Sequence, residues 1–506
     1  MAPKTPASVR EVPLVEQLSH LLAAHKQASP FATPGDWMRG CGTEPGLPFL
    51  ARRSSQADAR RVASVISLEA IPTPPIPRLP LVPDPLRRIR VPRDLGAVSA
   101  RADEVADVEA LGMTTAGIER IWAGVERLYR SGFYPAIALC VRRHGQVVLD
   151  RAIGHACGNG PSDREDATRT PATPETPFVI FSASKAMTAV VAHLLDERGL
   201  LHVDDRVCEY IPEYAAHGKE AITIGQVLSH RAGVPNLPAE AFDLDRFSDR
   251  EFRLEALCAA EPRSRPGKLL SYHAVSGGFI IAEIVQRVTG MDIRTVLGEE
   301  ILDPLGFRWG NYGVSPKDVE RVGVSYPTGP PALPPLSTVL ERALGLAPDE
   351  ITVQSNDPRF LTGVVPSGNV VTTANELSRF FELLAAGGEL DGVRILEPRT
   401  IRRAISERAF HEIDFSLVAP LRHASGFMLG ARAFSLFGPD TEEAFGHLGF
   451  TNVLGWADPE RALSVGLITS GKPMLHPALG DLWLFTRAIG QEAPKVARPG
   501  IWFTET

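Results

Sequence analysis

Apolar residues recur at helical spacing in several stretches of the chain. The first stretch follows Thr114 or Thr115, either of which can cap a helix, and Gly132 ends it. Its apolar positions lie three and four residues apart: Ile118, Ile121, Trp122, Val125, Leu128 and Tyr129. Further helices are expected after Ser182 as far as Gly199, over 376–384 and over 478–489. Regular structure is therefore expected to begin near Met113.

Two other regions have the composition of β-hairpins. Residues 136–149 form two β-rich runs around a His144-Gly145 turn. Residues 451–456 and 462–469 form a second pair of runs, separated by a turn at 458–461. The order is helix, strands, helices, strands and a final helix. It predicts an α+β fold with an antiparallel sheet flanked by helices and a mainly helical part in the middle of the chain.

The first 112 residues differ from the rest of the chain, and we interpret them as an extension before a domain at 113–490 and a tail at 491–506. Eight prolines crowd residues 71–92, so this segment should be extended and lie as a strap on the domain. Four arginines lie at the end of this segment or directly after it: Arg87, Arg88, Arg90 and Arg93. We expect a solvated basic strand there, with an anionic membrane or partner surface as the alternative.

Composition excludes several classes. The 506 residues are 44% hydrophobic and 22% charged, which supports a large core, and a net charge of -7 gives no reason to expect a nucleic acid partner. No apolar run reaches the roughly 18 residues of a membrane span. The five cysteines are scattered, which argues against a disulfide framework or a zinc site. With no secretory signal recognised, the expected location is cytoplasmic, and neither metal nor cofactor is expected.

The commoner hydrolase motifs do not occur. The nearest approach to G-x-S-x-G is Gly323-Val324-Ser325-Tyr326-Pro327, which lacks the second glycine. The chain has no H-E-x-x-H and no G-x-x-x-x-G-K. These observations argue against an α/β-hydrolase, a zinc protease and a P-loop enzyme.

One S-x-x-K motif is present, Ser182-Ala183-Ser184-Lys185. Residues i and i+3 share a face at the start of a helix, so the hydroxyl and the amine lie side by side. Burial at a helix N-terminus disfavours an ammonium ion, and a neutral lysine can help to remove the serine proton. None of the other seven lysines has a serine three residues before it. The spacing predicts a nucleophilic serine.

Two later segments add to this site in a fixed order. Tyr272 lies in Pro266-Gly-Lys-Leu-Leu-Ser-Tyr-His-Ala274, ahead of a helical run to Gly290. Gly446-His-Leu-Gly-Phe-Thr451 contains the only H-x-G of the chain and precedes a strand. Taken singly, a half-buried tyrosine and a hydrogen-bonded histidine are the simpler explanations. Their combination with the S-x-x-K motif favours a catalytic site.

With these motifs, the sequence resembles the serine β-lactamase-related family. That family includes class C β-lactamases, D-alanyl-D-alanine carboxypeptidases, D-aminopeptidases and family VIII carboxylesterases. The resemblance covers roughly residues 113–490 and extends to supporting segments: 181–189 around the serine, 228–235, 304–306 and 366–368. His230 and Gly233, in the second of these, are expected to be structural.

The resemblance implies a role for each motif. Ser182 would be the nucleophile, Lys185 its activator and Tyr272 the residue that passes the proton to the leaving group. His447, Leu448 and Gly449 would form the edge strand beside the substrate. The backbone N–H groups of Ser182 and Phe450 would form the oxyanion hole, where each donor can contribute about 3 kcal/mol.

The sequence departs from this family at two positions. Ala274 stands where the β-lactamases and carboxypeptidases carry Asn or Ser, and His447 stands where they carry Lys. Both changes remove contacts to amide substrates with a carboxylate, so the expected activity is hydrolysis of a small or medium acyl ester through an acyl-enzyme. The alternatives are a β-lactamase, a D-amino-acid amidase, an acyltransferase, or a non-catalytic recognition protein of the penicillin-binding type.

Overall fold

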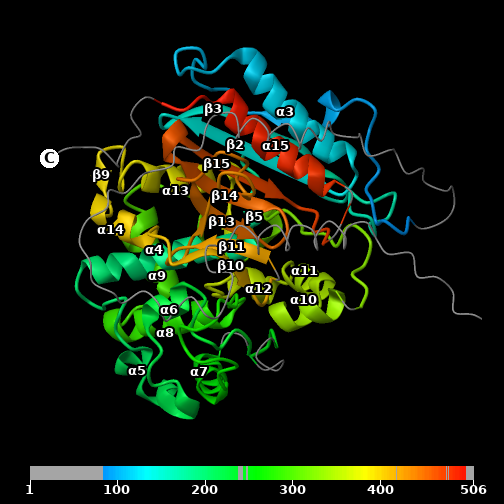
Figure 1. Cartoon of the computed structure of the whole chain (residues 1–506). Coiled ribbons are helices and arrows are strands. Elements are labelled where there is room, and N and C mark those ends of the chain that lie inside the picture. Colours follow the sequence, from blue (N-terminus) through cyan, green and yellow to red (C-terminus); the bar gives the residue numbers. More distant parts are fainter. Residues whose placement is uncertain are drawn as a thin grey trace, which may run out of the picture. The chain divides into compact units, whose positions relative to one another are not determined.

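Ten antiparallel strands form the main sheet of the chain (Figure 1). The computed structural model describes residues 84–496 apart from 238–242, 247–248, 335, 418, 475 and 477. In spatial order the strands are β1 (Ser99–Arg101), β3 (Gln146–Cys157), β2 (Ala136–Arg143), β15 (Leu463–Thr469), β14 (Val453–Asp458), β13 (Phe445–Gly449), β12 (Met428–Leu429), β11 (Ala419–His423) and β10 (Ala409–Asp414). The short β4 (Thr170–Pro171) also pairs with β3.

The two predicted hairpins are present at the centre of this sheet. β2 and β3 join through His144 and Gly145, whose φ values of 49° and 79° suit a tight two-residue turn. β14 and β15 join through a short 3-10 turn at Pro459–Arg461. β15 also pairs with β2, so strands from the two ends of the domain lie side by side, as the order of elements predicts.

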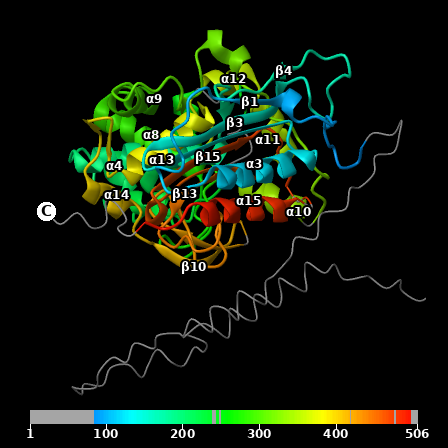
Figure 2. The same ribbon diagram turned by 90° about the horizontal axis from the view of Figure 1, so that it is seen from above.

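Two helices cover one face of the sheet, α3 (Thr115–Arg130) and α15 (Leu479–Glu492), which lie side by side in both views (Figures 1 and 2). The Thr114 hydroxyl accepts a hydrogen bond from the Gly117 N–H at 2.9 Å and caps α3. The six apolar positions predicted for this helix are all buried. Gly124 allows the close contact with Phe485 of α15.

The other face is covered by α13 (Ala374–Ala385), which packs on β2, β14 and β15. Gly455 and Gly466 make this contact possible, because a Cβ atom there would lie 2.4 Å from Phe381 and 2.3 Å from the Ala374 carbonyl. The remaining helices form a mainly helical part, which confirms the predicted α+β class: α4 (Ser184–Glu197), α5 (Val207–Tyr210), α6 (Ile224–Leu228), α7 (Arg250–Ala259), α8 (Ser276–Thr289), α9 (Ile293–Leu297), α10 (Leu336–Leu344), α11 (Pro348–Gln354), α12 (Pro358–Thr362) and α14 (Pro398–Ala404). No helix among the described residues is both long and apolar enough to cross a bilayer.

A second, three-stranded sheet joins two segments that are far apart in the sequence. β7 (Val370–Thr372) lies between β5 (Phe178–Val179) and β6 (Asn311–Tyr312). β5 ends just before Ser182, and β7 begins just after Ser367. This sheet therefore brings the 366–368 segment next to the S-x-x-K motif. A separate hairpin consists of β8 (Glu389–Leu390) and β9 (Val393–Arg394).

Regular structure begins earlier than the predicted start near Met113. Strand β1 pairs with β3 and adds an edge strand to the main sheet. Ile89 is buried, and its N–H donates a hydrogen bond to the Gly132 carbonyl at 2.7 Å. A three-residue strand of sequence Ser-Ala-Arg has too little alternation to be recognised by pattern. The proline-rich residues 71–83 lie outside the described part of the chain.

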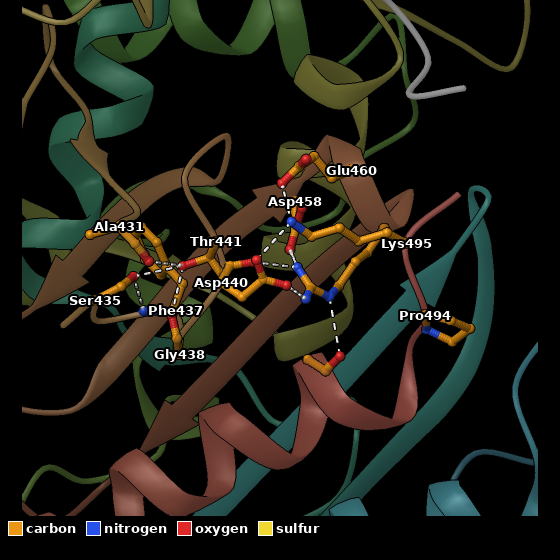
Figure 3. Close-up of polar contacts among 12 residues, drawn as sticks. Ala431, Ser435, Phe437, Gly438, Asp440, Thr441, Asp458, Glu460, Pro494 and Lys495 are labelled. Atoms are coloured by element: carbon orange, nitrogen blue, oxygen red, sulfur yellow. Dashed lines mark hydrogen bonds and ion pairs between the residues drawn. The ribbon is translucent and has the colours of Figure 1, made fainter. Parts of the chain in front are cut away.

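The C-terminal end of α15 is tied to the sheet by an ionic network around Arg461, whose partner Asp458 is buried; Figure 3 labels Asp440, Asp458 and Lys495 of this network. The Arg461 guanidinium is 2.8 Å from the Asp458 carboxylate and 2.9 Å from that of Asp440, and it donates to the Gly490 carbonyl at 3.1 Å. Lys495 pairs with Asp440 at 2.9 Å. The β14–β15 turn, the segment before β13 and the residues after α15 thus share one cluster of charges.

This network leads to a prediction about stability. Arg461→Ala leaves the buried Asp458 carboxylate without its counter-charge, so it should lower the free energy of unfolding by about 3–5 kcal/mol. Arg164→Ala is the matched control, because it removes the exposed Arg164–Asp166 pair and should cost at most about 1 kcal/mol. Urea denaturation of both variants tests this. Equal losses would mean that the network does not contribute as described.

Candidate active site

Ser182 lies in a 3-10 turn, Phe181–Ala183, between β5 and α4. The α-helix itself begins at Ser184, two residues after Ser182. Phe181 has a φ of 48°, which is uncommon for a residue with a side chain. The Ser184 hydroxyl holds this turn, since it donates to the Phe181 carbonyl at 2.5 Å and accepts from the Val370 N–H at 3.0 Å. The turn therefore presents Ser182 from a fixed backbone.

Lys185 is the second residue of α4, and its Nζ is 3.1 Å from the Ser182 Oγ. The same nitrogen donates to the carbonyl oxygens of Ala274 at 2.7 Å and Ser367 at 3.0 Å. A neutral amine has two hydrogens and one lone pair. With both hydrogens on carbonyl groups, the lone pair of Lys185 is left to face the hydroxyl of Ser182.

Burial sets the charge of Lys185. The side chain is 7% exposed, and removal from water lowers its pKa from 10.5 to about 7. At 1.36 kcal/mol per unit, the surroundings disfavour the ammonium form by roughly 5 kcal/mol. A large fraction of Lys185 is thus neutral near pH 7, where a free lysine would be almost entirely charged.

Tyr272 is the third predicted residue beside the serine. Its ring lies 4.9 Å from the Lys185 Nζ. Burial raises the pKa of this phenol, which keeps it protonated at neutral pH, and the Ser182 side chain offsets part of the rise. Tyr272 is therefore a neutral hydroxyl near Ser182, whereas Lys185 is the group able to accept a proton.

The Tyr272 segment has no regular structure of its own and is held by a residue that the sequence did not single out. The Asp414 carboxylate, at the end of β10, accepts from the N–H of Tyr272 at 3.1 Å. It also accepts from the N–H groups of Ser416 and Leu417 at 2.8 and 3.0 Å. The carboxylate is fully buried. Nothing in the sequence around Asp414 indicated this contact, which joins residues 142 positions apart.

The end of strand β13 lies against the turn that carries Ser182. A Cβ atom on Gly449 would be 2.1 Å from the Ile180 carbonyl oxygen, so only glycine permits this approach. Phe450 follows with a φ of 52°, and its ring stacks on Phe181 at 5.2 Å. Lys472, also missed from sequence, is buried with its Nζ 4.8 Å from the Phe181 ring. The predicted oxyanion-hole residues, Ser182 and Phe450, are thus on neighbouring segments.

His447 lies in the middle of β13, not at its start, and is buried. Its Nδ1 donates to the Leu448 carbonyl at 2.8 Å. Burial, aided by the nearby charge of Lys185, lowers the pKa of His447 to about 3. At neutral pH this side chain carries no charge where the β-lactamases carry a lysine. Its ring centroid is 6.5 Å from that of Tyr272.

Three further buried histidines, His230, His273 and His423, form a cluster that contacts the Tyr272 ring through His230. The His230 ring is 4.5 Å from the Tyr272 ring and 5.3 Å from that of His423. The Nδ1 of His230 accepts from the N–H of His273 at 3.2 Å. Burial lowers the pKa of all three, to about 4 for His273 and His423. Among the described residues, no group of three or more His, Cys, Asp or Glu side chains is arranged so that it could hold a metal ion.

The structure thus places all six sequence-predicted site residues around one point: Ser182, Lys185, Tyr272, His447, Gly449 and Phe450. They come from the 3-10 turn before α4 and the start of that helix, from the loop before α8, and from strand β13 with the residue after it. The antiparallel sheet with its mainly helical part is the fold that the resemblance to the serine β-lactamase-related family implies.

The comparison with known proteins gives the family. The family described as Beta-lactamase matches residues 123–485, and the chain belongs to it. A curated relative, the esterase/beta-lactamase LipL of Mycobacterium tuberculosis, is 32% identical over 343 residues, which are 65% of this chain and 76% of the relative. The predicted resemblance is confirmed.

Solved structures agree on the fold. A penicillin-binding protein homologue from Caulobacter crescentus has a TM-score of 0.64 and 26% identity, over 77% of this chain and 100% of its own. A family VIII carboxylesterase has a TM-score of 0.63 and 24% identity, over 76% of this chain and 99% of its own. Family and neighbours are hydrolases of the serine β-lactamase and esterase type.

The buried histidines make stability depend on pH. The pKa of His423 is about 4 in the folded chain and 6.5 when unfolded, so between these values the unfolded chain binds a proton that the folded chain does not. The stability that a neutral His423 supports is complete above pH 6.5 and is lost as the pH falls towards 4, by up to about 1.4 kcal/mol per pH unit. His423→Gln should reduce this slope, measured by urea denaturation at several pH values. An unchanged slope would contradict the burial of a neutral His423.

Proposed function

We propose that this protein is a serine carboxylesterase that acts through an acyl-enzyme on Ser182. The observation that carries the proposal is the position of Lys185, whose two N–H bonds are engaged by carbonyl groups while its nitrogen lies 3.1 Å from the Ser182 Oγ. A pKa of about 7 makes this amine a general base at neutral pH. The name of the relative LipL, an esterase/beta-lactamase, supports the same class.

In the first half-reaction the Ser182 oxygen attacks the ester carbonyl carbon as its proton passes to Lys185. The resulting oxyanion is stabilised by the N–H groups of Ser182 and Phe450. The carbon–oxygen bond to the alcohol then breaks, and the proton on Lys185 reaches the leaving oxygen through the Tyr272 hydroxyl. The products of this step are a free alcohol and an acyl group on Ser182.

In the second half-reaction a water molecule attacks the acyl carbon and gives its proton to the same pair of residues. The bond to the Ser182 oxygen breaks, and the proton returns to that oxygen. A carboxylic acid leaves, and Ser182, Lys185 and Tyr272 regain their starting protonation states. Over the cycle, an ester and water give an acid and an alcohol.

Two side chains favour an ester over a β-lactam or a peptide. Ala274 follows Tyr272 by two residues and offers no side-chain amide to bind the substrate's amide group. His447 is neutral at pH 7 and offers no fixed cation for a substrate carboxylate. Both features are compatible with an uncharged acyl ester.

The proposal is tested by labelling and turnover. A fluorophosphonate should give one adduct, located on Ser182 by mass spectrometry, and p-nitrophenyl acetate should be hydrolysed. Ser182→Ala should lose both the adduct and the esterase activity, whereas Ser406→Ala removes the hydroxyl of an exposed serine outside the site and should keep both. Labelling elsewhere, or unchanged turnover by Ser182→Ala, would refute the proposal. Nitrocefin turnover comparable to that of short esters would favour a β-lactamase. If neither nitrocefin nor esters were turned over, a non-catalytic recognition protein would be favoured.

A second prediction concerns the proton path. Lys185→Arg keeps the positive charge but cannot release a proton near neutral pH, so kcat for a short ester should fall at least about a hundredfold. Tyr272→Phe removes only the hydroxyl and should cost a similar factor. The double variant should lose little more than either single variant, because both residues serve one proton path.

Steady-state kinetics on p-nitrophenyl acetate, with circular dichroism to verify folding, would measure these losses. If Lys185→Arg kept most of the wild-type kcat, Lys185 would act as a fixed charge or as a structural residue.

A further inference from the structure

Beside Ser182 lies an apolar pocket whose outer wall is built by α10, α11 and the turn between them. Its volume is about 90 Å³. Leu344, Leu346 and Ile351 line it from this wall, and Phe360 and Val365 line it from the segment after α11. Ser182 and Phe450 line the same pocket. The pocket is therefore next to the oxygen that would react.

The wall is anchored to the rest of the described chain at several points. Ile351 and Phe360 pack against the apolar cluster that includes Val179 and Phe181. Asp349, at the start of α11, forms an ion pair with Arg87 at 2.5 Å, and the same arginine donates to the Gly329 carbonyl at 2.6 Å. Arg87, one of the basic residues noted in the sequence, thus holds the wall.

We propose that this pocket receives the acyl chain of the ester and that its size selects short apolar acyl groups of about four carbons. This inference rests on the proposed function. An apolar cavity of about 150 Å³ holds benzene, with six carbons, so 90 Å³ encloses roughly four. No ionisable side chain is among the described residues that line the pocket, so a charged acyl group would lose its hydration there without a partner.

The position of the pocket distinguishes the two halves of the ester. Ser182 and Phe450 line it, and these residues contact the acyl carbon and its oxyanion in the proposed reaction. Tyr272, which gives its proton to the leaving alcohol, does not line it. The group in the pocket is therefore the one that stays on Ser182 after the alcohol leaves.

The experiment uses the full chain and two series of esters. In the first, p-nitrophenyl esters carry straight acyl chains of two to twelve carbons, and in the second, acetates carry alcohols of graded length. Each methylene that enters the pocket should raise kcat/KM about fourfold, so the four-carbon ester, with two more methylenes, should exceed the acetate by roughly fifteenfold. At twelve carbons kcat/KM should have fallen at least tenfold from its maximum. Alcohol length should change kcat/KM by less than threefold.

Variants at Leu344 test whether the pocket determines how kcat/KM depends on acyl length. Leu344→Trp fills the cavity and should reduce the preference for the four-carbon ester over the acetate to about one, whereas Leu344→Ala should move the maximum to longer chains. Val339→Trp is the matched control on the same helix, because Val339 is 37% exposed and does not line the pocket. Its profile should match that of the wild type.

Several results would overturn this proposal. One is a wild-type kcat/KM that does not change with acyl length or that still rises at twelve carbons. Another is a kcat/KM that depends on the length of the alcohol instead. A third is the same profile for Leu344→Trp and Val339→Trp. Fluorophosphonate labelling of Ser182 tests the proposed esterase activity separately from the role of the pocket. With the adduct and acetate hydrolysis present, a wrong profile refutes only the pocket's role; without them, the proposed function and the pocket's role fail together.

Discussion

The burial of Lys185 between two carbonyl groups is the interaction on which the site depends. The amine joins three segments: helix α4, the loop after Tyr272 and the turn at Ser367. In water a lysine would hold three hydrogen-bonded waters and a full charge. Here it has two carbonyl partners and a hydroxyl, which suits a neutral amine better than an ammonium ion. The fold thus bears the cost of desolvating a lysine and keeps its lone pair beside Ser182.

Close backbone contacts hold strand β13 against the turn that carries Ser182. Gly449 lets β13 approach the Ile180 carbonyl, and the left-handed Phe181 and Phe450 turn the chain sharply on both sides of that contact. Backbone in sparsely populated conformations persists only where the surrounding structure enforces it. The hydrogen bonds of the Ser184 hydroxyl and the stacked phenylalanine rings provide that enforcement.

Parts of the fold and the site could be predicted from the sequence because they are local. Helix α3 and the β2–β3 hairpin follow from side-chain spacing and turn residues, and the S-x-x-K pair follows from helix geometry. Tyr272 and His447 needed the family resemblance, because single residues in loops and strands carry no local signal. Asp414, Lys472 and Ser367 were missed as contributors to the site. Each acts through contacts with segments distant in the sequence, and Ser367 acts through a backbone carbonyl that any residue possesses. The wall formed by α10 and α11 was missed for the same reason.

The central claim is that Lys185 is the base, with a pKa near 7, that activates Ser182. The most direct measurement is the second-order rate of Ser182 phosphonylation by an uncharged fluorophosphonate as a function of pH. Because only neutral Lys185 can accept the proton, the rate should rise with pH and reach a plateau, with an apparent pKa of about 7. A rate that is independent of pH between 5 and 9, or that rises only with an apparent pKa near the 10.5 of an exposed lysine, would contradict the account.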